Sequence, residues 1–275
     1  MASPSTHQPE RVAIICWVAR IGAVTAEALA HRQGCSVAAA RARLLAAERA
    51  QLLIRTRPLV GRPALYTVTR AGLRVSGLHG LEPCRVTAAT AAHAIACADA
   101  AAKLERCYPE HRLTGERELR SQERAFGGAL ASASLGEGAD GAVLLHRPDI
   151  VLWPERPHHG LPVAVEVELT VKAPQRLLEI CRAWARCRCV AGVLYLAAPD
   201  AHRALARAIS RVHAQERIAL LELAVLDQTA RAPAAPREAS QAQRRFQQGG
   251  QQPSNGEQDV LLLDKPGRPA GAIDP

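Results

Sequence analysis

The chain has 275 residues, of which 48% are hydrophobic, so it can build one large domain or two small ones around hydrophobic cores. Its formal net charge is +9, and residues 1–80 carry most of the excess, with eleven arginines against three acidic residues. A positive field concentrated on one small segment favours a polyanionic partner, most often nucleic acid. Because no apolar stretch approaches the length of a membrane span, we expect no membrane partner.

Eight cysteines raise the question of a disulfide framework. Nothing at the N-terminus resembles a secretory signal peptide, so we expect reduced thiols in a cytoplasmic protein. The CRAWARCRCV segment lacks the CxxC pairs of zinc modules, and we therefore expect its cysteines to be core residues rather than ligands of a structural metal.

Residues 10–80 predict a winged helix-turn-helix domain. The sequence favours a first apolar helix, then two short helices that begin after the capping residues Thr25 and Ser36 and are separated by a turn at Gly34. Two short β runs follow, joined by a basic tip around Arg62 that predicts a wing. In such domains the second helix of the motif enters the major groove and the wing touches the backbone nearby.

A helical projection divides the predicted recognition helix into a buried and an exposed side. Arg43 and Arg49 fall on the exposed side and can meet DNA, whereas Arg41 lies near the buried side and can be structural. The buried side comprises Val37, Ala40, Leu44, Leu45 and Leu52. We predict double-stranded DNA as the partner, and the candidate contacts are Ser36, Arg41, Arg43, Arg49, Arg55, Arg57 and Arg62. A winged helix that contacts another protein is the alternative.

Residues 85–227 predict a mixed α/β domain. A long Ala-rich helix over 87–107, on which we expect His93 to be a packing or surface residue, precedes a short extended piece and a helix within 111–126. The Gly/Ala/Ser-rich stretch 127–142 predicts a loop, and strands then alternate with helices from 146 to 227. Residues 228–275 are dominated by Gln, Pro, Gly and Ser and predict a disordered tail.

The segment VAVEVELTVK, residues 163–172, alternates without a break. Its valines and Leu169 share one face of a strand, and the other face carries Glu166, Glu168, Thr170 and Lys172. One interpretation is an edge strand whose polar face is solvated. The other is a metal site, because the preceding predicted strand, HRPDIVLW over residues 146–153, carries Asp149, and two hairpin-paired strands can bring its carboxylate beside Glu166.

The second interpretation matches the skeleton of the PD-(D/E)xK nuclease fold. Carboxylates from Asp149, Glu166 and Glu168 would hold a hard divalent cation such as Mg²⁺ through oxygen ligands. The ion would polarise a phosphate and lower the pKa of a bound water. The third position, where lysine is usual, is Glu168, and the only nearby lysine is Lys172 on the same face.

Four strings placed behind a winged helix, GERELR, RPDIVLW, VAVEVELTVKAPQRL and VAGVLYLAA, resemble the replication-relaxation family of bacterial plasmids and mobile elements. The resemblance covers most of residues 10–227. It implies a restriction-endonuclease-like domain and a role in plasmid replication or mobilisation through DNA, with replication or mobilisation proteins as further partners. The motif positions that it implies as site residues are Glu116, Glu118, Asp149, Glu166, Glu168, Thr170 and Lys172.

Three functional hypotheses follow from the sequence. The first is a DNA-binding protein of a plasmid or integrative element, with a nuclease-like domain that need not cut. The second is a Mg²⁺-dependent endonuclease in which the same row is catalytic. The third is a winged-helix transcription regulator whose α/β half is a ligand-binding or dimerising scaffold. The sequence leaves the oligomeric state open, a homodimer included.

Overall fold

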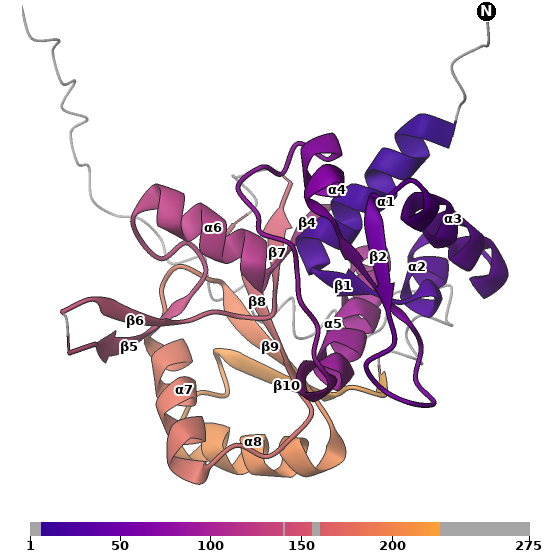
Figure 1. Cartoon of the computed structure of the whole chain (residues 1–275). Helices are drawn as coiled ribbons and strands as arrows, with labels where there is room; N and C mark the ends of the chain where they lie inside the picture. Colours follow the sequence, from indigo (N-terminus) through magenta and orange to yellow (C-terminus); the bar gives the residue numbers. More distant parts are fainter. Residues whose placement is uncertain (1–6, 140, 156–159, 226–275) are drawn as a thin grey trace, which may run out of the picture.

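The computed structural model describes residues 7–139, 141–155 and 160–225. Over these residues the protein is a mixed α/β structure with eight helices and three sheets (Figure 1). Among the described helices, none combines the length and the apolar character needed to cross a membrane. The tail predicted to be disordered, residues 228–275, lies outside the described part of the chain.

The N-terminal part contains the three helices and the hairpin expected between residues 10 and 80. Its elements are α1 (His7–Ile21), β1 (Ala23–Val24), α2 (Ala26–Gln33), α3 (Val37–Arg49), β2 (Leu53–Thr56), β3 (Leu65–Val68) and α4 (Arg70–Val75). The hydroxyls of Thr25 and Ser36 accept hydrogen bonds from backbone N–H groups of α2 and α3, as the capping pattern predicts. Gly34 ends α2 in the left-handed conformation, which turns the chain directly into α3.

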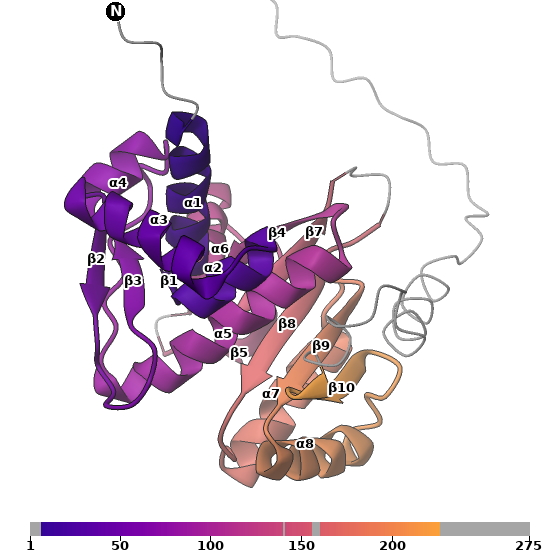
Figure 2. The same cartoon turned by 90° about the vertical axis from the view of Figure 1, so that its right-hand side faces the viewer.

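The rest of the described chain forms a five-stranded sheet with helices on both faces. Its elements are α5 (Ala88–Cys107), β4 (His111–Gly115), α6 (Glu116–Phe126), β5 (Ala133–Glu137), β6 (Val143–His146), β7 (Ile150–Pro154), β8 (Val163–Glu168), α7 (Pro174–Arg186), β9 (Gly192–Ala197), α8 (Pro199–Arg211) and β10 (Ile218–Glu222). The strand order is β10-β9-β8-β7-β4. Strands β4, β7 and β8 pair antiparallel, and β8, β9 and β10 pair parallel. Helix α5 covers one face, and α7 and α8 cover the other (Figure 2).

Two sequence predictions in this region were wrong in detail. The stretch 127–142, predicted as a loop, contains β5, which pairs with β6 as a separate hairpin. The strand predicted from His146 to Trp153 is interrupted, because β6 ends at His146 and β7 begins only at Ile150. The break places Asp149 in a bend immediately before β7.

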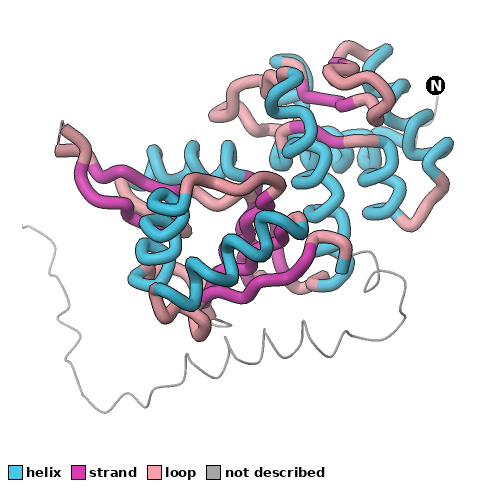
Figure 3. The backbone as a smooth tube through the Cα atoms, turned by 90° about the horizontal axis from the view of Figure 1, so that it is seen from below, coloured by secondary structure: helices cyan, strands magenta, loops and turns pink. Residues whose placement is uncertain are grey.

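Helix α5 belongs to two hydrophobic cores at once. Ala98 and Ala102 pack with the N-terminal helices, whereas Ala100, Ala101 and Leu104 pack with the sheet. Seen from below, the strands of the large sheet lie between helices on either side (Figure 3). The small side chains of α5 allow close approach from both directions, so the helix joins the N-terminal part to the sheet.

A second junction forms where Gly115 ends β4 and begins α6. A β-carbon at this position would lie 2.4 Å from the backbone oxygen of Arg20 in α1. The φ angle of Gly115 is −86°, which any residue can adopt, so the requirement for glycine is steric. Helix α1 therefore rests directly on the backbone of the β4–α6 turn.

We predict that Gly115→Ala destabilises the protein by about 1–3 kcal/mol, because the added methyl group forces two backbone segments apart. Urea unfolding followed by circular dichroism measures this change. Gly128→Ala is the matched control, since its β-carbon would meet only the Phe126 ring at 3.7 Å. Equal losses for the two variants would contradict the steric explanation.

Candidate functional site

Strand β8 lies in the middle of the five-stranded sheet. The solvated edge strand considered for this segment is therefore excluded, because β7 and β9 flank β8. Glu166 and Glu168 are only 6% and 7% exposed, on the face that α7 covers. The strand ends at Glu168, so Thr170 and Lys172 do not continue the row of the strand, and Thr170 is exposed beyond it.

Asp149 occupies the place where β7 stops pairing with β8. The register pairs Ile150 with Val165, and one further step places Asp149 opposite Glu166. The Asp149 carboxylate accepts a hydrogen bond from the backbone N–H of Val167 at 2.8 Å. The Val167 carbonyl oxygen lies 3.0 Å from Nε2 of His93 on α5. Asp149 and His93 thus satisfy the backbone groups of β8 that have lost their strand partner.

His93 and Cys97 bring a nitrogen and a sulfur to the same carboxylate. They are four residues apart on α5, so both side chains lie on one face of the helix. His93 Nε2 is 3.3 Å from Asp149 Oδ2, and Cys97 Sγ is 3.6 Å from His93 Nδ1. These three residues offer ligand atoms that all lie within 4.8 Å of one another, and together they could hold a metal ion.

The surroundings shift the pKa values of both α5 side chains upward. The hydrogen bond to Asp149 is the main cause that raises the pKa of His93, and burial opposes it. Burial is also the main cause that raises the pKa of the Cys97 thiol well above its usual range, and the negative charges of Asp149, Glu166 and Glu116 add to it. In the metal-free protein Cys97 is consequently a neutral thiol at neutral pH.

Glu166 has its own set of partners on the opposite face of β8. Its Oε1 accepts a hydrogen bond from Trp184 Nε1 at 3.2 Å and lies 2.7 Å from His146 Nε2. The contact between His146 and Glu166 is electrostatic, because the angle at His146 Nε2 does not suit a hydrogen bond. Burial is the largest influence on the pKa of Glu166 and raises it, whereas His146 lowers it.

Of the remaining predicted site residues, Lys172 and Glu116 lie near Asp149 and the end of β8, and Glu118 does not. Lys172 forms an ion pair with Glu168 at the end of β8. Glu116 begins α6, where its backbone N–H donates to the Asp149 carbonyl and its side chain pairs with Arg120. Glu118 points elsewhere, toward the arginines of β4 and α1, with Arg112 at 3.4 Å. The structure therefore does not bring Glu118 to Asp149.

The predicted DNA contacts on α3 need one correction. Arg43, expected on the exposed side, turns inward and donates to Gln33 Oε1 at 2.7 Å, with Glu10 Oε1 at 3.1 Å. Arg41, expected near the buried side, is 56% exposed. Ala40 and Leu44 are buried as predicted, whereas Val37 is exposed and Ala47, which was not predicted, is buried.

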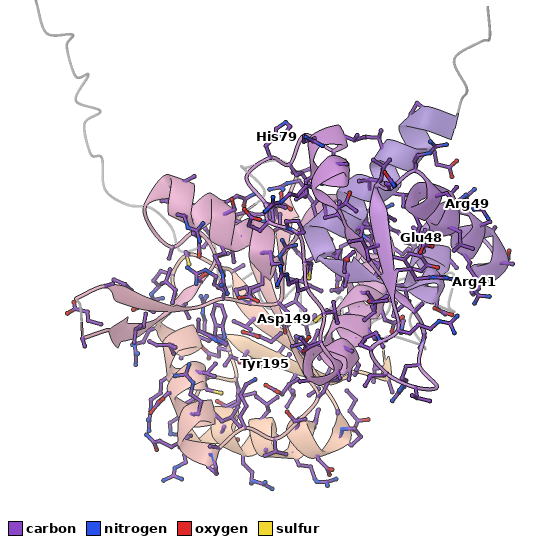
Figure 4. The ribbon with its side chains drawn as sticks, in the orientation of Figure 1. Arg41, Glu48, Arg49, His79, Asp149 and Tyr195 are labelled. Atoms are coloured by element: carbon purple, nitrogen blue, oxygen red, sulfur yellow. The ribbon has the colours of Figure 1, made fainter. Side chains whose placement is uncertain are left out.

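The other predicted contacts lie on the surface of the N-terminal part. Arg49 is exposed on α3, and Arg57 and Arg62 are exposed on the segment that joins β2 to β3. Arg55 lies 3.6 Å from Glu48. Ser36 caps α3 through its side chain. Figure 4 shows Arg41 and Arg49 at the outer side of the molecule, far from Asp149 near its middle.

Four side chains of the site were not identified from the sequence: His93, Cys97, His146 and Trp184. His93 was expected to be a packing or surface residue, and the i, i+4 spacing of His93 and Cys97 on a predicted helix was the signal that could have identified this pair. No local pattern predicts that His146 and Trp184 meet Glu166, because the three residues come from different elements.

Comparisons of the chain with protein-family models, with curated proteins and with solved structures find no match. The function of the site must therefore be argued from its own geometry.

We predict that Asp149→Ala lowers the free energy of unfolding by about 1–3 kcal/mol, because it leaves the Val167 N–H without its partner. Asp149→Asn should lose less, since an amide oxygen can still accept that hydrogen bond. Urea unfolding in the presence of a chelator measures both changes. Glu179→Ala, at an exposed position on α7, is the control and should stay within about 0.5 kcal/mol of the wild type. A wild-type stability for Asp149→Ala would show that the carboxylate has no structural role.

Proposed function

We propose that the protein binds double-stranded DNA through its N-terminal part and assists the replication or mobilisation of a plasmid or integrative element. In this proposal residues 10–80 are a winged helix-turn-helix domain, and the sheet domain is a restriction-endonuclease-like fold of the replication-relaxation type. The observation that carries the proposal is the group of exposed arginines on α3 and on the β2–β3 hairpin: Arg41, Arg49, Arg55, Arg57 and Arg62.

The local structure suits such a domain. Helices α2 and α3 are joined by the tight turn at Gly34, and the hairpin follows α3 directly. A helix of this kind can enter the major groove while the hairpin contacts phosphates alongside it. Arginine suits this surface because its guanidinium group binds phosphate oxygens in a bidentate manner.

Two acidic residues near these arginines reduce the positive charge of the surface but do not neutralise it. Glu27 lies 3.7 Å from Arg41, and Glu48 lies 3.6 Å from Arg55. Both pairs are partly exposed, so each contributes little to stability and can open when a phosphate replaces the carboxylate. Glu48 is labelled beside Arg49 and Arg41 in Figure 4.

A Mg²⁺-dependent endonuclease is the second candidate function. It is suggested by the register that places Asp149 opposite Glu166, with Glu168 two residues further along β8. The side chains nevertheless diverge, because Asp149 contacts His93 on the α5 side and Glu166 contacts Trp184 on the α7 side. Carboxylate oxygens are ligands that Mg²⁺ prefers. All three carboxylates, however, already have partners: His93 for Asp149, His146 for Glu166 and Lys172 for Glu168. A Mg²⁺ ion bound by these carboxylates would have to displace their partners. The ion pairs therefore argue against metal-dependent cleavage, and we prefer the proposal of DNA binding without cleavage.

The DNA-binding proposal predicts a strong dependence of affinity on salt. Replacing Arg55, Arg57 and Arg62 together with alanine should weaken binding to every duplex and flatten the plot of log K against log salt. Each lost phosphate contact should change the slope by about 0.9. Fluorescence anisotropy of labelled duplex DNA with the full chain measures both quantities.

The matched control replaces the three exposed arginines of α8, Arg203, Arg207 and Arg211, with alanine. It removes the same charge from a helix that lies away from α3 (Figure 1). If the two triple variants weakened binding equally, the effect would come from net charge alone, and the N-terminal surface would not be the DNA-binding site.

Glu48→Gln provides a test with the opposite sign. Removing this carboxylate releases Arg55 from its ion pair, and the variant should bind duplex DNA about three- to fivefold more tightly at low salt. The gain should disappear in the double variant with Arg55→Ala, and the same anisotropy titrations measure it. An affinity unchanged by Glu48→Gln would place Arg55 outside the DNA interface.

Incubation of supercoiled plasmid with Mg²⁺ or Mn²⁺ distinguishes the two candidate functions. The favoured proposal expects binding without nicking. Nicking by the wild-type protein that disappears in Asp149→Ala and weakens in Lys172→Ala would establish the endonuclease instead.

A further inference from the structure

The three side chains of His93, Cys97 and Asp149 form a compact set of potential ligands beside the start of β7. We propose that they bind a transition-metal ion of the zinc type. This site differs in chemistry from the Mg²⁺ site of three carboxylates considered above, and it does not depend on DNA binding. The two sites have Asp149 in common.

The spacing of the ligand atoms fits a tetrahedral ion. Bonds of about 2.0–2.1 Å to nitrogen and oxygen and about 2.3 Å to sulfur, at tetrahedral angles, place neighbouring ligand atoms roughly 3.3–3.6 Å apart. His93 Nε2 is 3.3 Å from Asp149 Oδ2 and 3.7 Å from Cys97 Sγ. The third separation, from Cys97 Sγ to the Asp149 oxygen, is within 4.8 Å, so the ligand atoms have to draw together to surround an ion.

The ligand types select the ion. Imidazole nitrogen and thiolate sulfur suit Zn²⁺ and its neighbours in the transition series, whereas Mg²⁺ takes oxygen ligands. Binding releases the thiol proton of Cys97 and the proton that His93 Nε2 directs to the Val167 carbonyl oxygen and Asp149, since each ligand atom must present a lone pair to the ion. The ion thus replaces the contact between His93 and the Val167 carbonyl oxygen. Three protein ligands leave a fourth position for water or another small ligand.

The surroundings hold two of the ligands in place and leave a path for the ion. The Val167 N–H fixes the Asp149 carboxylate from the central strand of the sheet. Cys97 is buried against the same sheet, and the side chain of His93 is 44% exposed. The site is thus rigid on its inner side and open to solvent on the side of His93.

A second pair of thiols must be separated from this site in any experiment. Cys187 and Cys189 have their sulfur atoms 3.2 Å apart, and both contact the Ser132 carbonyl oxygen. The hydrogen bond from Cys189 is the main cause that lowers the pKa of Cys187 to about 6, and the positively charged Arg217 adds to it, so this pair also offers a thiolate. Cys189→Ser is therefore the control variant for Cys97→Ser.

The test is a titration of the chelator-treated full chain with Zn²⁺ by calorimetry and with Co²⁺ by absorption spectroscopy. We expect one ion per chain, with a sulfur-to-cobalt charge-transfer band and the intense visible bands of tetrahedral Co²⁺. Cys97→Ser should lose the charge-transfer band, and His93→Gln should weaken binding more than roughly 100-fold, beyond the effect of removing an outer-shell partner. Cys189→Ser and Glu166→Gln should bind both ions as the wild type does.

Each other outcome decides against the proposal. Absence of binding by the folded wild-type chain, or a band that survives Cys97→Ser and vanishes in Cys189→Ser, would overturn it. So would Zn²⁺ binding that is lost in Glu166→Gln and unchanged in His93→Gln. Circular dichroism establishes that each variant is folded, and His93→Gln, at a half-exposed position, decides the question if Cys97→Ser does not fold.

The experiment also separates this proposal from the proposed function. DNA affinity measured in the presence of a chelator should be the same for His93→Gln and the wild type, because His93 is not among the proposed DNA contacts and the exposed Arg41 and Arg49 of α3 lie far from Asp149 (Figure 4). The triple variant of Arg55, Arg57 and Arg62 should bind Zn²⁺ normally. Failure of either interaction therefore leaves the other measurable.

Discussion

The packing of α5 between two cores is the constraint on which the rest of the structure depends. Alanines on one side of the helix meet the N-terminal helices, and Ala100, Ala101 and Leu104 on the other side meet the sheet. A larger residue on either face would separate the two parts, since protein interiors are close-packed and tolerate added volume poorly. This packing also fixes where the first half of α5 lies, and so brings His93 and Cys97 to Asp149 at the start of β7.

The position of the site follows from the break between β6 and β7. Had the strand run without interruption from His146, as the sequence predicted, the register would have placed Pro148 opposite Val167. Proline offers a carbonyl acceptor but no N–H for the Val167 carbonyl oxygen, so the strand could not have paired fully with Val167. Because β7 starts at Ile150, a carboxylate and an imidazole take over that role. The late start of β7 thus leaves room for a cluster of polar side chains beside the central strand β8, and the backbone groups of Val167 orient these side chains.

Local signals in the sequence predicted most helices and strands, but they could not predict contacts between residues that are distant in the sequence. Capping hydroxyls at Thr25 and Ser36 identified the starts of α2 and α3 correctly, and strict alternation identified β8 as a strand but extended it past its end at Glu168. Alternation could not show that β8 is the central strand of the sheet, because an edge strand can have the same pattern. It also could not show that the polar face, with Glu166 and Glu168, is buried. The inward turn of Arg43 depends on Gln33 and Glu10, which no helical projection of α3 contains.

The two carboxylates at the centre of the sheet are served from opposite faces of β8. Asp149 meets His93 from α5, whereas Glu166 meets His146 and Trp184 on the side of α7. The α5 side adds the sulfur of Cys97, and the α7 side offers carboxylate oxygens and an indole donor. Because the hardness of its ligands decides which ion a site prefers, the two sides are not equivalent even though their residues are adjacent in register. A zinc-type ion on the α5 side would occupy Asp149 and so compete with any Mg²⁺ that requires Asp149 and Glu166 together.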